Sequence, residues 1–227
     1  MKITWIGQSG YVVCTEKTKI VIDPYLSDIV NKIANRPRLV PSPLVPSEIR
    51  ADAIICSHDH LDHFDTDAVM KMSRALPFVA TSDCKTKLLD MGFSNVTALS
   101  VGDSVTVGDI TLTAVYANHT VDAFGIILSA KGKTLYFSGD TVYDEKLFDV
   151  KKFSPDVTFI CINGKLGNMN VEEAVTTAKE IGAAVNVPNH YGMFASNTEN
   201  PELFTEKLDN GFIMEFNREY DICEILK

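Results

Sequence analysis

Every histidine of this chain belongs to a small set of residues that could bind metal ions. Three histidines stand close together in the stretch Ser57-His-Asp-His-Leu-Asp-His63, and two more stand alone far downstream. Imidazole nitrogens and carboxylate oxygens suit zinc and also manganese, iron or cobalt. The set therefore predicts a buried centre of two metal ions, and hence an enzyme. The predicted metal-binding residues are His58, His60, Asp62, His63, His119, Asp140 and His190.

The spacing of the first cluster fits the end of a strand. Residues 53–56 form a short apolar run typical of a buried strand. His58 and His60 are two residues apart, so an extended backbone would place both imidazoles on the same side. The next two donors follow where the chain turns into a helix that Asp65 could cap, so the cluster can face two different metals. No cysteine belongs to it, which disfavours a closed structural zinc site.

The other three donors follow apolar segments of strand character. Residues 111–116 precede His119, residues 134–137 precede Asp140, and residues 183–187 precede His190. Loops gathered at one edge of a pair of sheets would bring these side chains together. The strands would then provide rigid positioning and the loops the chemistry.

The order His-x-His-x-Asp-His, then His, Asp and His, resembles the metallo-β-lactamase fold superfamily of hydrolases over the span from residue 23 to residue 190. The resemblance implies an α/β fold, in which two mixed β-sheets flanked by helices form an αββα sandwich. It also divides the metal ligands into two groups and one bridge. His58, His60 and His119 would hold one metal, Asp62, His63 and His190 the other, and Asp140 would bridge them.

Within the superfamily, the chain is similar to the L-ascorbate-6-phosphate lactonase group. Residues 57–65 resemble its first metal motif, residues 132–143 its bridging-aspartate segment, and residues 170–202 its last ligand region. The segment around His119 is more similar to smaller uncharacterised hydrolases of the same group. The resemblance implies a hydrolase that opens a lactone or cleaves a related ester, with a phosphorylated sugar acid as a candidate substrate.

Two metals would lower the pKa of a bridging water, and the resulting metal-bound hydroxide would attack the substrate. Asp62 could orient this nucleophile and accept a proton, in addition to binding metal. A binuclear phosphodiesterase is the second interpretation, because the same metals can hold a phosphate. An iron-dependent redox protein is a third and weaker one, since the iron-based oxygen reductases of this superfamily carry Glu where this chain has His60.

The elements that must position these residues follow from periodicity and turn signals. Residues 171–181 give the clearest helix, with one apolar stripe, a capping-box start at Asn170 and Glu173, and Gly182 at its end. Further helices are predicted near 66–75, 84–91, 144–150 and 201–209. Strands are predicted near 2–6, 11–15, 18–22, 53–56, 104–107, 110–116, 124–129, 134–137, 156–161, 183–187, 212–216 and 220–225.

Several residues could contact the substrate. Residues 24–50, which contain five prolines, read as a long loop beside the active-site cleft, and Arg36 or Arg38 could meet an anionic group there. A solvated surface loop is the alternative. Lys165, in a glycine-bearing loop, could contact substrate oxygens, although turn chemistry also explains that loop. Tyr191, after the last donor, could line the pocket or simply pack.

Two aspartates beside the donors have supporting roles in this interpretation. By resemblance to the superfamily, Asp23 would support a metal-binding histidine, with turn formation before Pro24 as the alternative. Asp59, between two of the donors, is expected to support the site or face solvent rather than bind metal.

Composition limits the remaining function classes. The chain has 227 residues, which fits a single hydrolase domain over 1–227, and a net charge of −9 without a basic arm, which argues against nucleic-acid binding. Five scattered cysteines predict no disulfide framework, and no stretch approaches a membrane span. A cytoplasmic protein with a small-molecule substrate and no membrane partner is expected. The oligomeric state stays open, with a homo-oligomer among the alternatives.

Overall fold

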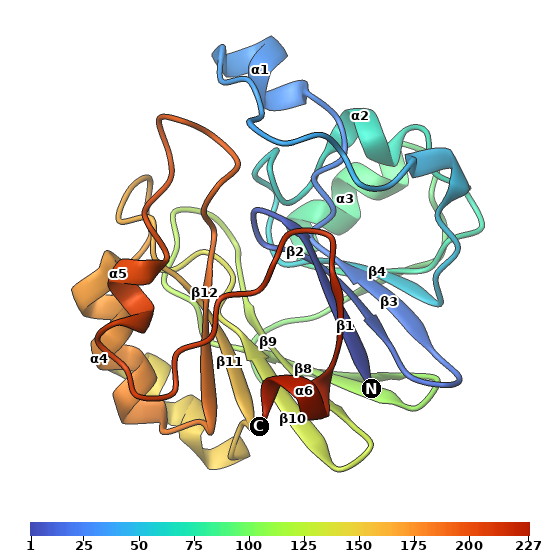
Figure 1. Ribbon diagram of the computed structural model, residues 1–227. Coiled ribbons are helices and arrows are strands. Elements are labelled where there is room, and N and C mark those ends of the chain that lie inside the picture. Colours follow the sequence, from blue (N-terminus) through green and yellow to red (C-terminus); the bar gives the residue numbers. More distant parts are fainter.

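Two mixed β-sheets pack together in the computed structural model, which describes residues 1–227, and helices cover their outer faces (Figure 1). The predicted αββα sandwich is thereby confirmed. One sheet consists, in spatial order, of β13 (Glu219–Asp221), β1 (Lys2–Gly7), β2 (Gly10–Cys14), β3 (Lys19–Ile22), β4 (Ala53–Cys56), β5 (Phe78–Ala80) and β6 (Val96–Ala98). The other consists of β12 (Val185–Asn189), β11 (Val157–Cys161), β10 (Lys133–Phe137), β9 (Gly125–Ala130), β8 (Ile110–Val115) and β7 (Ser104–Val107).

Each sheet combines an antiparallel part with a parallel part. Strands β1, β2 and β3 pair antiparallel, and β3 to β6 pair parallel. Strands β7 to β10 pair antiparallel, and β10 to β12 pair parallel. All four residues of β4 are buried, as are all five of β11, which fits parallel strands covered on both faces.

Aromatic side chains join the two sheets. The ring of Phe137 on β10 stacks on Phe159 on β11 with centroids 4.5 Å apart, and the ring of Tyr11 on β2 lies 4.9 Å from Phe159. The Tyr11 hydroxyl donates a hydrogen bond of 2.9 Å to Oδ1 of Asn189, at the end of β12. This contact satisfies the polar end of a buried tyrosine and fixes β12 against the opposite sheet.

The helices differ in how strongly the local sequence defines them. Helix α4 has the predicted bounds, with Asn170 and Glu173 forming the capping box and Gly182 ending it at a φ of 73°. None of the helices has the length and apolar character that a membrane crossing requires. The α-helices are α1 (Ile29–Ala34), α2 (Thr66–Val69), α3 (Ser82–Asp90), α4 (Val171–Ile181), α5 (Glu202–Thr205) and α6 (Ile222–Ile225), and the 3-10 helices are η1 (Pro46–Glu48) and η2 (Glu145–Phe153).

Several predicted elements were wrong. Residues 212–216 form no strand, because Phe212 is the only one of them with a backbone hydrogen bond to β12, from its amide to the Asn186 carbonyl. The strand predicted over 220–225 ends at Asp221, which accepts a hydrogen bond from the Cys223 amide and starts α6. Strands β5 and β6 were missed because they have only three residues each. Helices α2 and α5 are shorter than predicted, and residues 145–153 form a 3-10 helix.

The predicted loop over residues 24–50 contains α1 and η1 and is tied to the body of the protein by Asp65. The Asp65 carboxylate is fully buried and accepts hydrogen bonds from the amides of Leu26 and Ser27, from the Ser27 hydroxyl and from the Ala68 amide at the start of α2. One side chain therefore caps a helix, as the sequence predicted, and holds the entry to the loop.

Asp65→Ala should lower the free energy of unfolding by at least about 2 kcal/mol, because several buried donors would lose a charged acceptor. Asp67→Ala, in the same helix, is the matched control, since its partner Lys32 is exposed and the pair should contribute less than about 1 kcal/mol. Urea unfolding of both variants in the presence of a chelator measures the difference. Equal losses would contradict this role for Asp65.

Candidate metal centre

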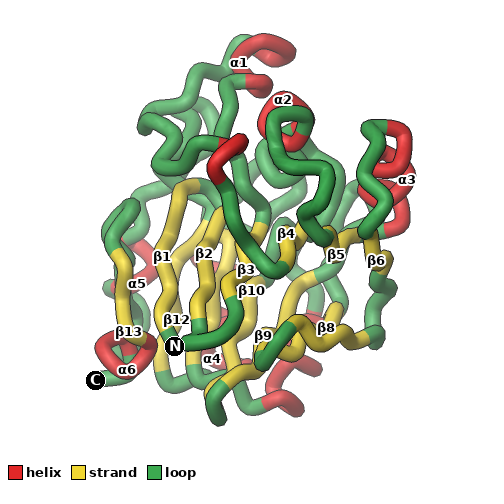
Figure 2. Tube along the Cα trace, turned by 90° about the vertical axis from the view of Figure 1, so that its right-hand side faces the viewer, coloured by secondary structure: helices red, strands yellow, loops and turns green.

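All the predicted donors meet at one end of the two sheets. Figure 2 shows loops gathered at the end nearest α1 and α2, opposite the end where both termini lie. The first four donors come from the loop between β4 and α2, and the others follow β8, β10 and β12. Each of two groups has its donor atoms within 4.8 Å of one another. These groups are His58, His60, His119 and Asp140, and Asp62, His63 and His190.

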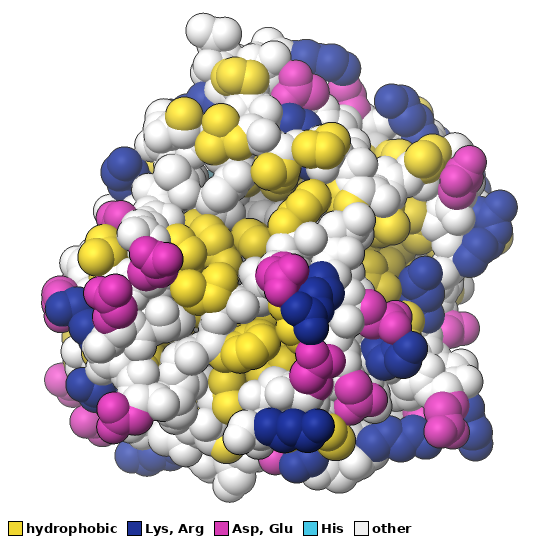
Figure 3. All heavy atoms as spheres, viewed as in Figure 1, with side chains coloured by type: hydrophobic (Ala, Val, Ile, Leu, Met, Phe, Trp, Pro, Cys, Tyr) yellow, Lys and Arg dark blue, Asp and Glu magenta, His cyan; other side chains and the backbone are white.

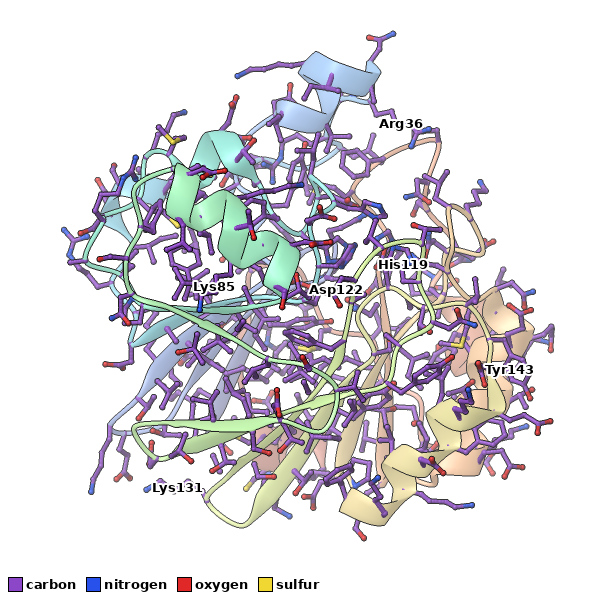
Figure 4. The ribbon with its side chains drawn as sticks, turned by 180° about the vertical axis from the view of Figure 1, so that it is seen from behind. Arg36, Lys85, His119, Asp122, Lys131 and Tyr143 are labelled. Carbon is purple, nitrogen blue, oxygen red and sulfur yellow. The ribbon has the colours of Figure 1, made fainter.

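Three imidazoles of the first group point their nitrogens at a common point. His60 Nδ1 lies 3.2 Å from His58 Nε2 and 3.1 Å from His119 Nε2. The side chains of His58 and His119 are fully buried, whereas His60 is half-buried. Figure 4 shows His119 in the middle of the molecule, where the loop after β8 reaches in from the second sheet. Two distant segments of the sequence thus form one set of donors.

Asp140 lies between the two groups. Its Oδ1 lies 3.2 Å from both His63 Nε2 and His190 Nε2. Its Oδ2 faces the other way, 4.0 Å from His58 Nε2 and 3.9 Å from His119 Nε2. One carboxylate therefore presents one oxygen to each group.

The nitrogens that point away from the centre are held by hydrogen bonds. Nδ1 of His63 donates to Asp23 Oδ2 at 2.8 Å, and Nδ1 of His119 lies 3.1 Å from the Gly167 carbonyl oxygen. Nδ1 of His58 lies 3.0 Å from the Ser57 hydroxyl, which itself donates to Asp23. Such contacts fix the ring orientation and leave each Nε2 free to bind a metal. Asp23 thus contacts one of the predicted donors, as the resemblance implied.

Gln8 is a member of the site that the sequence did not reveal. Its side chain is fully buried between β1 and β2, and its amide nitrogen donates to Asp62 Oδ2 at 2.8 Å and lies 3.0 Å from His190 Nε2. The backbone of Gln8 is left-handed, with a φ of 52°. The only signal in the sequence is a polar Gln-Ser pair between Gly7 and Gly10 in an otherwise apolar hairpin.

Asp59 behaves as the sequence suggested. Its Oδ2 pairs with Lys87 Nζ of α3 at 2.6 Å, outside both donor groups. It therefore links the metal-binding loop to a helix rather than contributing a donor.

The two groups differ in protonation. Burial lowers the pKa of His58 well below its ordinary value, and it also lowers that of His119. Burial acts in the same direction on His63 and His190, but neighbouring carboxylates together outweigh it. These are Asp140, Asp23 and Asp62 at His63, and Asp140 and Asp62 at His190. The pKa of His63 is therefore raised well above its usual range and that of His190 to about 9. The two histidines in turn hold the pKa of Asp140 well below its ordinary value despite its burial.

The polar atoms of the site fit a divalent metal. His63 Nε2 and Asp140 Oδ1 are buried without any hydrogen-bond partner, although they lie only 3.2 Å apart. Leaving such atoms unpaired is costly, and a cation between them would satisfy both. The donor atoms are nitrogen and oxygen without sulfur, a set that zinc, manganese and iron accept.

The centre opens into a cleft of about 590 Å³. Its floor includes His60, Asp62, Asp140 and His190, so the half-buried side of the centre can be reached by a small molecule. Residues of α1 form part of the wall. The sequence prediction that the loop over 24–50 lies beside the cleft is therefore confirmed.

The residues predicted to bind substrate lie outside this lining. Arg38 donates from Nε to the Val40 carbonyl at 2.7 Å and stacks over the Tyr25 ring, so its guanidinium stabilises the loop. Tyr191 is buried against Trp5, with ring centroids 4.8 Å apart, which supports the packing alternative. The contacts favour the packing alternative for both side chains, and substrate binding by Arg38 and Tyr191 stays a prediction.

The two other predicted contacts are Arg36 and Lys165. Figure 4 shows Arg36 at the upper edge of the molecule, well away from His119. Lys165 Nζ lies 3.5 Å from the Ser196 carbonyl oxygen, which joins two surface loops. Neither side chain belongs to the lining of the cleft.

Comparison with known proteins supports this architecture. A metallo hydrolase from the hyperthermophilic archaeon Ignicoccus hospitalis has 22% sequence identity and a TM-score of 0.81, with 96% of this chain and 97% of that chain covered. An isothiocyanate hydrolase from Delia radicum gut bacteria has 21% identity and a TM-score of 0.80, with 97% and 98% covered. Both likenesses concern the fold.

A relative from Shouchella clausii, described as a UPF0173 metal-dependent hydrolase, is 29% identical over 93% of this chain and 94% of its own length. Residues 18–191 match the family model described as a β-lactamase superfamily domain, which is more than half of the 227 residues. The chain therefore belongs to the β-lactamase superfamily, as a metal-dependent hydrolase with the metallo-β-lactamase fold.

Proposed function

We propose that this hydrolase opens lactones or cleaves related carboxylic esters of small molecules at a centre of two divalent cations, with zinc or manganese as the first candidates and iron as the third. The position of Asp140 carries the proposal. Its two oxygens face two separate groups of donors, and no other carboxylate of the site is shared in this way. The proposed ligands are His58, His60 and His119 for one ion and Asp62, His63 and His190 for the other, with Asp140 between them.

Cations bound there would activate a water molecule and polarise the ester carbonyl. Asp62 reaches the cleft and accepts from Gln8 at Oδ2, which leaves Oδ1 to take a proton from the attacking water. The same atom can return the proton to the leaving oxygen when the ester bond breaks. The acyl carbon gains a hydroxyl group, and the former ring oxygen becomes an alcohol.

One candidate substrate belongs to this proposal, and two other substrate classes are alternatives to it. The likeness to the ascorbate-6-phosphate lactonase group supports a phosphorylated sugar lactone, and a phosphodiester is the second class that two metals could hydrolyse. An isothiocyanate, which is a small neutral electrophile, is a further candidate substrate because an isothiocyanate hydrolase has the same fold. Nucleic acid is disfavoured by the net charge of −9.

Metal-loaded protein should hydrolyse members of a panel of neutral lactones, phosphorylated lactones, phosphodiesters and isothiocyanates, with bound metal measured on the same sample.

His60→Ala and Asp140→Ala should each lower kcat/KM by at least about 100-fold and reduce the bound metal, because changes to residues that only orient metal ligands already cost about 10–100-fold. Asp59→Ala is the control beside the donors and should retain its metal. Turnover of phosphodiesters alone would overturn the ester assignment, and full activity of either ligand variant would overturn the metal centre.

Metal affinity should increase as pH rises toward about 9, since the pKa of His190 is about 9 in the metal-free protein and binding must displace its proton. Below about pH 9, the metal affinity should increase about tenfold per pH unit for each proton that the metal displaces. Calorimetric titration of metal in buffers of different ionisation enthalpy counts the protons released. The first ion should release fewer than the second if it occupies the site of His58 and His119, whose pKa values are lowered. Zero proton release for both ions would contradict this account.

Gly167→Ala should weaken metal binding about tenfold, because the added methyl group would lie 3.0 Å from His119 Cε1 and push the ring out of place. Gly102→Ala is the matched control: its φ of 99° is close to the 90° of Gly167, but no atom lies within 4 Å of the added carbon. Both variants carry the cost of a left-handed alanine, and only the first touches a donor. Equal metal affinities in the two variants would rule out this role of Gly167.

A further inference from the structure

The cleft above the donors has an apolar wall. Four hydrophobic residues from three segments line it: Val30 and Ala34 of α1, Leu61 between two donors, and Leu166 in the loop before α4. Figure 3 shows hydrophobic side chains at the upper part of the molecule, where Figure 1 places α1. This wall stands directly beside the position at which a substrate would react.

The wall is anchored to the protein body. Ile29 packs with Tyr25, Met193 and Phe194 in a buried cluster, and Val30 and Leu61 pack against that cluster. The Leu39 amide also donates to the Met193 carbonyl at 2.8 Å, which joins the loop of residues 24–50 to the loop after β12. Two of the four wall residues, Val30 and Leu61, are therefore held against the core of the protein.

Leu166 adds an apolar side chain at the mouth. It is 57% exposed and has a left-handed backbone with a φ of 55°, a conformation that is uncommon for leucine. It directly precedes Gly167, whose carbonyl oxygen contacts His119. The loop that orients a metal ligand thus also presents an apolar side chain to the cleft.

No lysine or arginine lines the cleft. Arg38 is engaged by backbone carbonyls and the Tyr25 ring, and Lys165 contacts the Ser196 carbonyl. A phosphate or carboxylate placed against the apolar wall would lose its hydration without gaining a charged partner. Burial of an alkyl group against the same wall is favourable, because it removes apolar surface from water.

We infer that the cleft binds an uncharged aliphatic substituent of the substrate, next to the ester that the metal centre hydrolyses. This inference rests on the proposed function and selects one class within it, neutral lactones or esters with an alkyl chain. The phosphorylated sugar acid that the family resemblance suggested then becomes a poor substrate.

A series of γ-lactones with alkyl chains of increasing length, each compared with a counterpart that ends in phosphate, tests the inference on the metal-loaded full chain. The value of kcat/KM should increase by up to about fourfold per added methylene until the wall is covered, and the phosphorylated counterparts should be worse substrates. A preference for the phosphorylated compounds would overturn the inference while leaving the lactonase assignment intact.

Leu166→Lys should reduce the ratio of kcat/KM between long-chain and unsubstituted lactones and improve the relative turnover of phosphorylated ones. Val101→Lys is the matched control, because Val101 is also exposed, at 55%, and lies outside the lining of the cleft. An unchanged ratio of kcat/KM in Leu166→Lys would contradict binding of the alkyl chain by the apolar wall.

Binding of alkyl-substituted cyclopentanones, which lack the ester bond, separates the two proposals. Calorimetry should show affinity that increases with chain length in the wild type and increases less in Leu166→Lys. If the ketones bind in this way but no lactone is hydrolysed, the proposed function fails and the apolar site stands. If ketone affinity does not depend on chain length, the inference fails whatever the enzyme hydrolyses.

Discussion

A single buried carboxylate, that of Asp23, connects the first sheet to the metal centre. It follows β3, where its backbone has a φ of 43°, and its amide donates to the carbonyl of Ile55 on β4. Its oxygens accept from the Ser57 amide, the Ser57 hydroxyl and His63 Nδ1. A carboxylate at this depth requires such donors. The end of β3, the end of β4 and the orientation of His63 are therefore set by one network.

The two sheets contribute to the centre in different ways. The first provides a continuous loop with four donors, whereas the second places one donor after each of three strands. Asp140 joins these contributions, because its carboxylate faces histidines from both sheets. A shift of one sheet against the other would separate the groups. The contact from Tyr11 on β2 to Asn189 at the end of β12 opposes that shift.

The sequence was informative where local rules act and silent where distant segments meet. Helix α4 follows from Asn170, Glu173 and Gly182 alone, and the seven donors follow from residue type and their places at strand ends. Gln8 could not be found, because its role depends on Asp62 and His190, which are far away in the chain. The roles of Arg38 and Tyr191 likewise depend on Tyr25 and Trp5, which contact them only after folding. The strand predicted over residues 212–216 did not form, because only the Phe212 amide finds a backbone partner on β12.

Half of the apolar wall is carried by a segment that contains none of the metal-binding residues. Val30 and Ala34 belong to α1, a short helix outside both sheets, whereas the histidines and aspartates stand at strand ends. Residues in α1 can therefore be exchanged, lengthened or randomised in a library while the ligands remain in place. Substitutions in α1 would therefore change which substrate binds without altering the residues that perform hydrolysis. This holds for engineered variants and for natural divergence alike. New specificities are accessible from this scaffold through a segment of six residues.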